Sequence, residues 1–484
     1  MKLFLFAIVV LVICIFLGPA VIENTGLVLG AALGIFFLFL ALTNFETGLM
    51  ILLFVIPLSV QLNVTSVKGG APIDFGVDDF FIFCLFITWL VHIAKTGQSP
   101  FSPNPLTFPF IGYLAACVVS LLPLAMIGKG NIALSALHLV KWYEYVFIYF
   151  VLVNSLKTRE QIVRFTVLAI GSAVLISFIN LMQVIYGLVT GADTHFFKVA
   201  TASFESNGIL GAFYLFFLSI ITSFIVTTEK GTTRFILGVL GGIMSFTLFY
   251  TFARGAYLGM VCALVFLGFL HHKKMLVFSL LMLSIVPVFT SKAVGERVSM
   301  TIHVDSSNLK DFGIQQRGGM KGYQAYQAGG RTFQLDQSSA ERFYQWAKAR
   351  KAIDQNPIIG TGYWGGRYLG VYGFTTIHNH YLTTLIETGI FGLASFLWLS
   401  WSLIADAAFF ASKTGDPFYC AIARGLAAGY FGVLVHCFFG ESFESFRLTG
   451  PLWIMCGIVF AAKKVYWDSV TEYYLQQQNQ AGAA

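Results

Sequence analysis

The residues best suited to chemistry lie where a long polar segment of the chain re-enters an apolar run. His378, Asn379 and His380 follow one another in the sequence TTIHNHYL, directly before TTLIETGIFG. Histidine titrates near neutral pH, so it can accept a proton and then release it. An ionisable group is costly to keep at the border of an apolar segment, which indicates a functional role.

Arginines, carboxylates and other polar residues stand at the borders of further apolar runs. The orientation given by the positive-inside rule places them on the same side of a membrane as His378. Arginine suits a diphosphate because its planar fork offers two parallel donors and stays charged at any working pH. Together with a histidine that moves a proton, such arginines indicate transfer of a group from a phosphate-bearing donor to a hydroxyl. These polar residues are Lys141, Glu144, Glu205, Asn207, Arg254, Arg342, Arg350, Glu441, Glu444 and Arg447.

Structural roles compete with these functional ones. Arg254 also suits an interfacial arginine at a helix end, and Asn207 suits a helix N-cap. Arg342 falls on the polar face of an expected amphipathic helix, where arginine is common. Lys141 and Glu144 stand three residues apart and share a helix face, so an internal ion pair is as reasonable as a substrate contact.

The spacing of His378 and His380 also admits a metal site. On a helix the two side chains would diverge, and no third ligand stands at a recognisable spacing. We therefore expect no metal and no other cofactor, and we interpret Asn379 as the residue that sets the geometry of the helix start. The polar residues of segment 441–447 fit a solvated loop as well as a site.

The composition is that of a polytopic membrane protein. Of 484 residues, 57% are hydrophobic and only 11% are charged, against roughly 25% charged in an average soluble domain. The net charge is +7, but no basic cluster with interleaved aromatic residues stands in a polar region, so we expect no nucleic-acid partner. The seven cysteines lie in or beside apolar runs and form no Cys-x-x-Cys pair, so no disulfide framework is predicted.

Apolar runs of about 20 residues, long enough to cross the membrane as helices, recur along the chain. We predict an all-α polytopic membrane protein with 12 to 14 transmembrane helices. The expected spans are 3–22, 26–43, 47–63, 79–95, 106–127, 134–155, 163–189, 208–227, 233–252, 255–271, 274–290, 381–404, 418–438 and 449–466.

The positive-inside rule orients these spans. With the N-terminus inside, the inner flanks hold twelve Lys and Arg and the short outer loops hold five. This predicts cytoplasmic termini, N-terminal spans over 1–290, an outer segment 291–380, C-terminal spans over 381–466 and a cytoplasmic tail 467–484.

The outer segment divides into two parts. Residues 305–337 are rich in Gly and Gln with little apolar periodicity, which predicts a mobile loop or lid. Next, Ser338-Ser339-Ala340-Glu341 forms a capping-box pattern, and Phe343, Trp346, Ala347 and Ile353 follow at helical spacing, so an amphipathic helix is predicted that ends before Pro357. The Gln-rich tail after Tyr474 is predicted to be disordered.

Three runs resemble the bacterial O-antigen ligase and polymerase superfamily. They are TFARGAYLG, RFYQWAKARKAIDQNPIIGTG and HNHYLTTLIETGIFG, in that order, with a long outer loop between the first and the third. SFESNGILGAFYL and KWYEY are similar to weaker family segments, so the resemblance covers roughly residues 130 to 400. It implies a helical membrane bundle related to the C-type glycosyltransferases.

The resemblance also implies a chemistry. Such proteins transfer saccharide from an undecaprenyl-diphosphate carrier at the outer, periplasmic face of the bacterial inner membrane, without a metal ion. Arg254 and Arg342 would bind the diphosphate, and His378 would position or deprotonate the acceptor hydroxyl. The acceptor, a glycan or a lipid A-core sugar, stays open because the 305–337 insert matches no family motif. A transporter or flippase of lipid-linked saccharide is the alternative, although no repeat symmetry is evident.

Overall fold

A computed structural model describes most of the chain. The described residues are 35–58, 61–65, 73–97, 104–127, 132–190, 204, 206–271, 323–328, 331–336, 342, 345–346, 349–350, 352–365 and 376–483. The predicted spans 3–22 and 274–290, the first part of 26–43 and Glu205 lie outside them.

Within these residues, ten helices are long and apolar enough to cross a membrane. They correspond one by one to ten of the predicted spans, which confirms an all-α polytopic membrane protein. The helices are α4 (Val77–Thr96), α5 (Thr107–Ile127), α6 (Ile132–Ser155), α7 (Arg159–Thr190), α8 (Asn207–Thr227), α9 (Gly231–Tyr250), α10 (Arg254–His271), α15 (His380–Lys413), α16 (Pro417–His436) and α17 (Phe446–Ala483).

The predicted span 47–63 is wrong. Helix α3 (Phe45–Val55) passes into a 3-10 turn, η1 (Ile56–Leu58), which holds Pro57, a residue that cannot donate to a helical hydrogen bond. The chain continues as strand β1 (Gln61–Thr65), which pairs antiparallel with β2 (Ile73–Gly76). The apolar run therefore ends in a hairpin.

A second hairpin lies within the segment predicted to be a loop or lid. Strand β3 (Tyr323–Ala328) pairs antiparallel with β4 (Arg331–Asp336). Gly329 and Gly330 stand between the strands in the sequence, a pair that favours a two-residue hairpin turn. This signal was overlooked because the segment is so rich in Gly and Gln.

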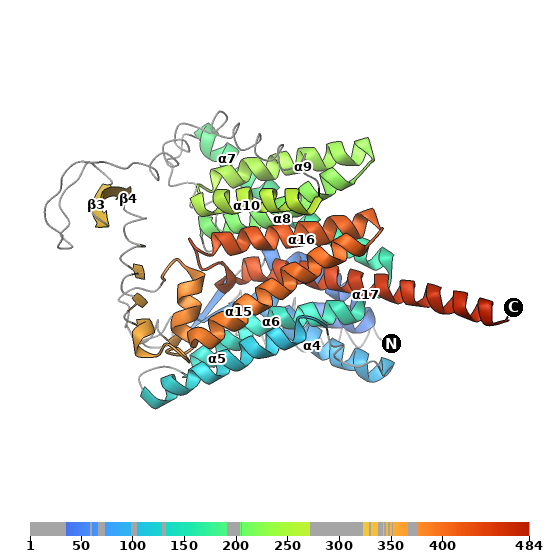
Figure 1. The fold of residues 1–484 in the computed structure, drawn as a ribbon, viewed down its shortest axis with the longest axis horizontal. Coiled ribbons are helices and arrows are strands. Elements are labelled where there is room, and N and C mark those ends of the chain that lie inside the picture. The colour runs from blue at the N-terminus through green and yellow to red at the C-terminus, as the bar shows by residue number, and fades with distance from the viewer. Residues whose placement is uncertain are drawn as a thin grey trace, which may run out of the picture.

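The C-terminal tail is also more regular than predicted. Helix α17 continues without a break to Ala483, and its last turns are exposed. Figure 1 shows this end of α17 extending away from the other helices. Glutamine is a good helix former, so the Gln-rich sequence extends a helix that is already nucleated within the bundle.

Close helix packing builds the centre of the bundle, where α16 runs beside α8 and α10 (Figure 1). Small residues on α16 permit this approach. A Cβ at Gly425 would lie 2.6 Å from the Cα of Ile220, and one at Gly429 would lie 2.8 Å from the carbonyl oxygen of Phe216. Glycines at such spacing let helix backbones meet in membrane proteins.

Helix α15 is broken at Gly389, whose φ of 67° and ψ of −169° are non-helical. The loop segment 357–362 supplies hydrogen bonds across the break. Thr361 N donates to Ile386 O at 2.8 Å, and Gly362 N donates to Glu387 O at 3.0 Å. The break is why the family-like run at the start of α15 contains a glycine at this position, and it fixes the first two turns of α15 against the loop.

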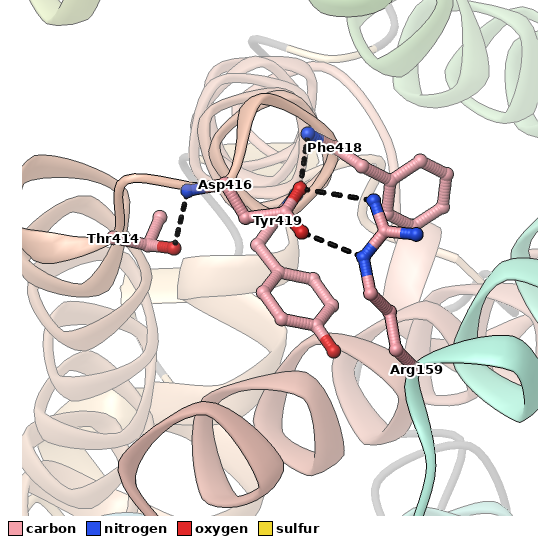
Figure 2. A network of polar contacts seen from close by, with 5 residues as sticks. All are labelled: Arg159, Thr414, Asp416, Phe418 and Tyr419. Carbon is pink, nitrogen blue, oxygen red and sulfur yellow. Dashed lines mark hydrogen bonds and ion pairs between the residues drawn. The ribbon is translucent and has the colours of Figure 1, made fainter. Parts of the chain in front are cut away.

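At one end of the bundle, an ion pair joins α7 to the start of α16 (Figure 2). Asp416 caps α16 by accepting from Phe418 N at 2.8 Å, and Arg159 Nε donates to the same carboxylate at 2.6 Å. Burial raises the pKa of the Asp416 carboxyl, but the hydrogen bonds from Arg159 and the cap outweigh it and hold the pKa below its usual value.

Candidate functional site

His378 stands directly before α15 in a left-handed backbone conformation, with a φ of 53°. This region is uncommon for a residue with a side chain, and it persists only where the surroundings hold it. The imidazole is exposed, and its Nε2 lies 3.3 Å from the hydroxyl oxygen of Thr376. The predicted catalytic residue is thus presented at a surface by a constrained turn.

Asn379 caps the helix that follows. Its side chain accepts from Leu382 N at 3.1 Å, and the residue is buried. An asparagine cap of this kind satisfies one of the unpaired N–H groups at a helix start. Asn379 therefore sets the direction in which α15 leaves the turn, which is the supporting role predicted for it.

His380 occupies a different environment from His378. It is buried, with its ring 5.0 Å from that of Phe396 and 5.3 Å from that of Phe443. Its backbone N–H donates to Cys437 O at 2.9 Å. His380 thus packs among aromatic rings and anchors the helix start to the end of α16.

The loop helix that carries Arg342 packs on the same turn. Trp346 Nε1 donates to Ile377 O at 3.2 Å, and Ala349 and Ala352 are buried against Ile377. Arg342 is helical and half-buried, one turn before Trp346. The described part of the predicted amphipathic helix therefore packs on the turn of His378 and carries Arg342, whereas Arg350 is exposed.

Glu441 fixes the turn from the opposite side. Its Oε1 accepts from Ile377 N at 2.7 Å and from the Thr383 hydroxyl at 2.8 Å. These two donors lie on either side of His378 and Asn379 in the sequence. Of the two interpretations left open for segment 441–447, the structure thus excludes a freely solvated side chain for Glu441.

Arg254 is the first residue of α10 and is half-buried. A short connection, Thr251–Ala253, separates it from α9, and Phe252 in this connection has a φ of 53°. The predicted break before Arg254 is therefore confirmed. The start of α10 also lies against the start of α8, since a Cβ at Gly211 would lie 2.7 Å from the Cβ of Ala256.

Asn207 is the first residue of α8, but it is not the N-cap. The cap is Ser206, whose side chain accepts from Ile209 N at 3.3 Å. The capping interpretation of Asn207 was therefore wrong by one residue. Its side chain is half-buried in the first turn, and a substrate contact stays a prediction.

His436, the last residue of α16, lies where these helix starts meet, and it was missed in the sequence. It is 3% exposed, and its Nδ1 lies 2.6 Å from Ser442 Oγ. A Cβ at Gly255 would lie 3.3 Å from the imidazole, and one at Gly208 would lie 3.8 Å from Nε2.

The signal for His436 was the same one that identified His378, an ionisable residue at the border of an apolar run. His436 was missed because it lies inside the predicted span 418–438, near its end. The starts of α8 and α10 both pack on His436, and the turn that follows His436 binds Ile377, on which the loop helix of Arg342 also packs.

Lys141 and Glu144 form a separate polar cluster. Lys141 Nζ lies 3.0 Å from Asp79 Oδ2 on α4, and it also lies 4.8 Å from the centre of the Phe446 ring. Lys141 therefore forms an ion pair with Asp79 on another helix. Glu144 itself interacts with Asp79, so this cluster ties α4, α6 and the start of α17 together.

The grouped residues can hold an anion. Two helix N-termini, whose free N–H groups attract negative charge, meet beside an arginine that begins one of them. A second arginine, Arg342, is on the loop helix that packs on the turn of His378. The exposed imidazole of His378 is joined to this group through the turn that links α16 to Glu441.

Comparison with known families gives a match. A family model described as O-Antigen ligase matches residues 239–397. The matched stretch runs from α9 to the middle of α15 and contains Arg254, Arg342 and His378. No curated protein matches the chain. Residues 239–397 of this multi-pass inner-membrane protein thus match the O-antigen ligase family, which supports the O-antigen ligase and polymerase superfamily.

Proposed function

We propose that the protein transfers a saccharide from an undecaprenyl-diphosphate carrier to a sugar hydroxyl, by an inverting reaction that uses no metal ion. The observation that carries the proposal is that Arg254, Arg342 and His378 lie in one matched domain. The start of α10, which begins with Arg254, packs on His436, and Glu441 of the turn that follows His436 binds the backbone next to His378. The loop helix that carries Arg342 packs on the same backbone through Trp346. The superfamily supports a role of this type.

In the proposed reaction, the acceptor oxygen attacks the anomeric carbon as the bond from that carbon to the diphosphate oxygen breaks. His378 takes the proton of the acceptor hydroxyl. Arg254 and Arg342 stabilise the negative charge that develops on the departing undecaprenyl diphosphate. A single displacement inverts the configuration of the anomeric carbon.

The left-handed turn suits His378 to this role because it holds an exposed imidazole at a defined place directly before the N-cap of α15. Holding the donor, the acceptor hydroxyl and the histidine in a fixed mutual geometry lowers the entropic cost of the reaction. The half-buried positions of Arg254 and Arg342 favour strong charge pairing, since water screens such arginines less than exposed ones.

The site faces the periplasm in this proposal, because the excess of Lys and Arg on the other flanks marks the cytoplasmic side. The acceptor is a second lipid-linked glycan if the protein is a polymerase, and a lipid A-core sugar if it is an O-antigen ligase. Glycosylation of a protein is a third possibility. Each uses the same donor and the same three residues.

The test uses purified protein in detergent with lipid-linked saccharide extracted from cells that lack the protein. We expect release of undecaprenyl diphosphate and formation of a longer or transferred glycan. His378→Ala and Arg254→Ala should abolish both products. Arg350→Ala, a change at an exposed arginine of the same loop helix, is the matched control and should leave both unchanged.

A transporter would leave the glycosyl bond intact, so an unaltered donor with wild-type protein would refute the proposed transfer. Full conversion by His378→Ala would refute the role of the histidine even if the transfer itself were observed.

A further inference from the structure

One short segment, the 436–442 turn (His436 to Ser442), contacts the starts of three helices. These helices begin with the residues of the three sequence runs that could do chemistry: α8 with Asn207, α10 with Arg254, and α15 directly after His378. The turn lies beyond residues 239–397, so the family match does not include it.

Glu441 and Cys437 of the turn hold the His378 side of the site. Glu441 Oε1 accepts from Ile377 N at 2.7 Å and from Thr383 Oγ1 at 2.8 Å, and Cys437 O accepts from His380 N at 2.9 Å. Both donors to Glu441 use the same oxygen. A backbone that stays left-handed at His378 needs such bonds on both sides.

His436 and Phe439 of the turn hold the Arg254 side. A Cβ at Gly255 would lie 2.9 Å from the Cβ of Phe439 and 3.3 Å from Cδ2 of His436. His436 Nδ1 lies 2.6 Å from Ser442 Oγ, so the turn closes on itself through this contact. The helix start that carries Arg254 therefore rests directly on the His436 ring.

We propose that the 436–442 turn is the positioning element of the site, with Glu441 placing His378 and His436 placing Arg254. The inference rests on the proposed function, because it assigns Glu441 to the acceptor side of the site and His436 to the donor side. Neither side chain is required to touch the substrate. Each acts by holding the backbone that presents a residue of the reaction.

The Glu441 arm is tested by three substitutions. Glu441→Gln keeps Oε1 as an acceptor for both donors, whereas Glu441→Ala removes it and Glu441→Asp withdraws it by one methylene. A misplacement of about 1 Å at a reacting group can cost about 100-fold in rate. We therefore expect Glu441→Ala and Glu441→Asp to lower kcat by about 30-fold or more, and Glu441→Gln to restore most of that loss.

The His436 arm is tested by binding. Undecaprenyl diphosphate, the product of the proposed reaction, is titrated into purified protein, and its Kd is measured from the thermal stabilisation it causes. His436→Phe fills the same space without a ring nitrogen, and Ser442→Ala removes its partner. We expect both to weaken binding about tenfold, and Glu441→Ala to leave the Kd unchanged.

A merely structural role would lower kcat and binding together. The inference predicts instead that the Glu441 variants lose kcat and that the His436 and Ser442 variants lose binding. If all these variants lower kcat and binding in parallel, or if Glu441→Ala turns over as fast as Glu441→Gln, the inference is overturned. Glu472→Ala, at an exposed glutamate of α17, is the control for charge removal. A fully active His378→Ala would instead overturn the proposed function, whereas an inactive His378→Ala with an unaffected Glu441→Ala would overturn this inference alone.

Discussion

Substitution of Gly389 by alanine should detach the loop from the broken helix and disable the site. The φ of 67° and ψ of −169° at this residue belong to a region that is essentially restricted to glycine. A Cβ there would lie 2.2 Å from Ile358 O and 2.6 Å from Ile359 N. Both atoms belong to backbone, so the side chain could not be accommodated by a rotamer change.

The magnitude follows from two contributions. Backbone strain of this kind costs about 1–3 kcal/mol. Moving the loop away also threatens the bonds from Thr361 N, Gly362 N and Ile390 N across the break, each of which contributes about 1 kcal/mol. We expect a loss of about 3–5 kcal/mol in the free energy of unfolding, together with loss of transfer, because the first turns of α15 carry the cap that follows His378.

The assay is thermal unfolding in detergent, followed with a thiol-reactive dye. Cys117, Cys437 and Cys456 are buried in the folded protein and become reactive when it unfolds. Gly238→Ala is the matched control: it places an alanine in α9, where a Cβ would meet nothing within 4 Å, and it should be neutral or stabilising by up to about 1 kcal/mol. A Gly389→Ala protein as stable and active as wild type would refute the reasoning.

Three further outcomes follow from contacts in the structure. Asp416→Asn keeps an N-cap but loses the ion pair with Arg159. The folded pKa of Asp416 lies below its usual value. The stability that this carboxylate contributes is therefore present above about pH 4 and is lost as the pH falls through the folded pKa. The Tm difference from wild type should therefore be present at pH 7, where the partly exposed pair contributes less than about 1 kcal/mol, and should shrink in acid; a difference that grows in acid would contradict this. Asp79→Asn leaves the charge of Lys141 without its carboxylate partner and should cost about 3–5 kcal/mol in thermal unfolding, more than Glu144→Gln. Trp346→Phe removes the bond to Ile377 O and should cost about 1 kcal/mol while lowering transfer, and an unchanged Tm would show that this bond contributes little.

The membrane-spanning helices were predictable because long apolar runs have few alternatives in a membrane. For ten predicted spans, the majority of the predicted boundaries lie within a few residues of the ends of the described helices. The errors came where an apolar run was not a helix throughout. Pro57 and the hairpin after it shortened one predicted span, and the Gly329-Gly330 pair marked a hairpin in the segment predicted to be a loop.

The site could be predicted only in part, because its parts are joined by contacts between distant segments. His378, Arg254 and Arg342 were visible as ionisable residues at apolar borders within recognisable runs. The bond between Glu441 and Ile377 joins residues 64 positions apart, and no local pattern contains it. Likewise, Lys141 pairs with Asp79 on another helix, although Glu144 was nearer in sequence.

His436 likewise could not be identified from a local sequence pattern. Its position at the end of an apolar run made it resemble a core residue, and its burial fits that description. What distinguishes it is the convergence of Gly208, Gly255 and Ser442 on one imidazole. Helix packing decides that convergence, and packing could not be derived from spacing along the chain.

The most direct test of the central claim compares wild-type and His378→Ala proteins in one reaction with purified lipid-linked saccharide. Release of undecaprenyl diphosphate and glycan transfer are measured in the same samples, and binding of undecaprenyl diphosphate confirms that the variant is folded. We predict that wild type yields both products and that His378→Ala binds undecaprenyl diphosphate but yields neither. Equal transfer by the two proteins would contradict the assignment of His378 as the residue that takes the proton from the hydroxyl of the acceptor.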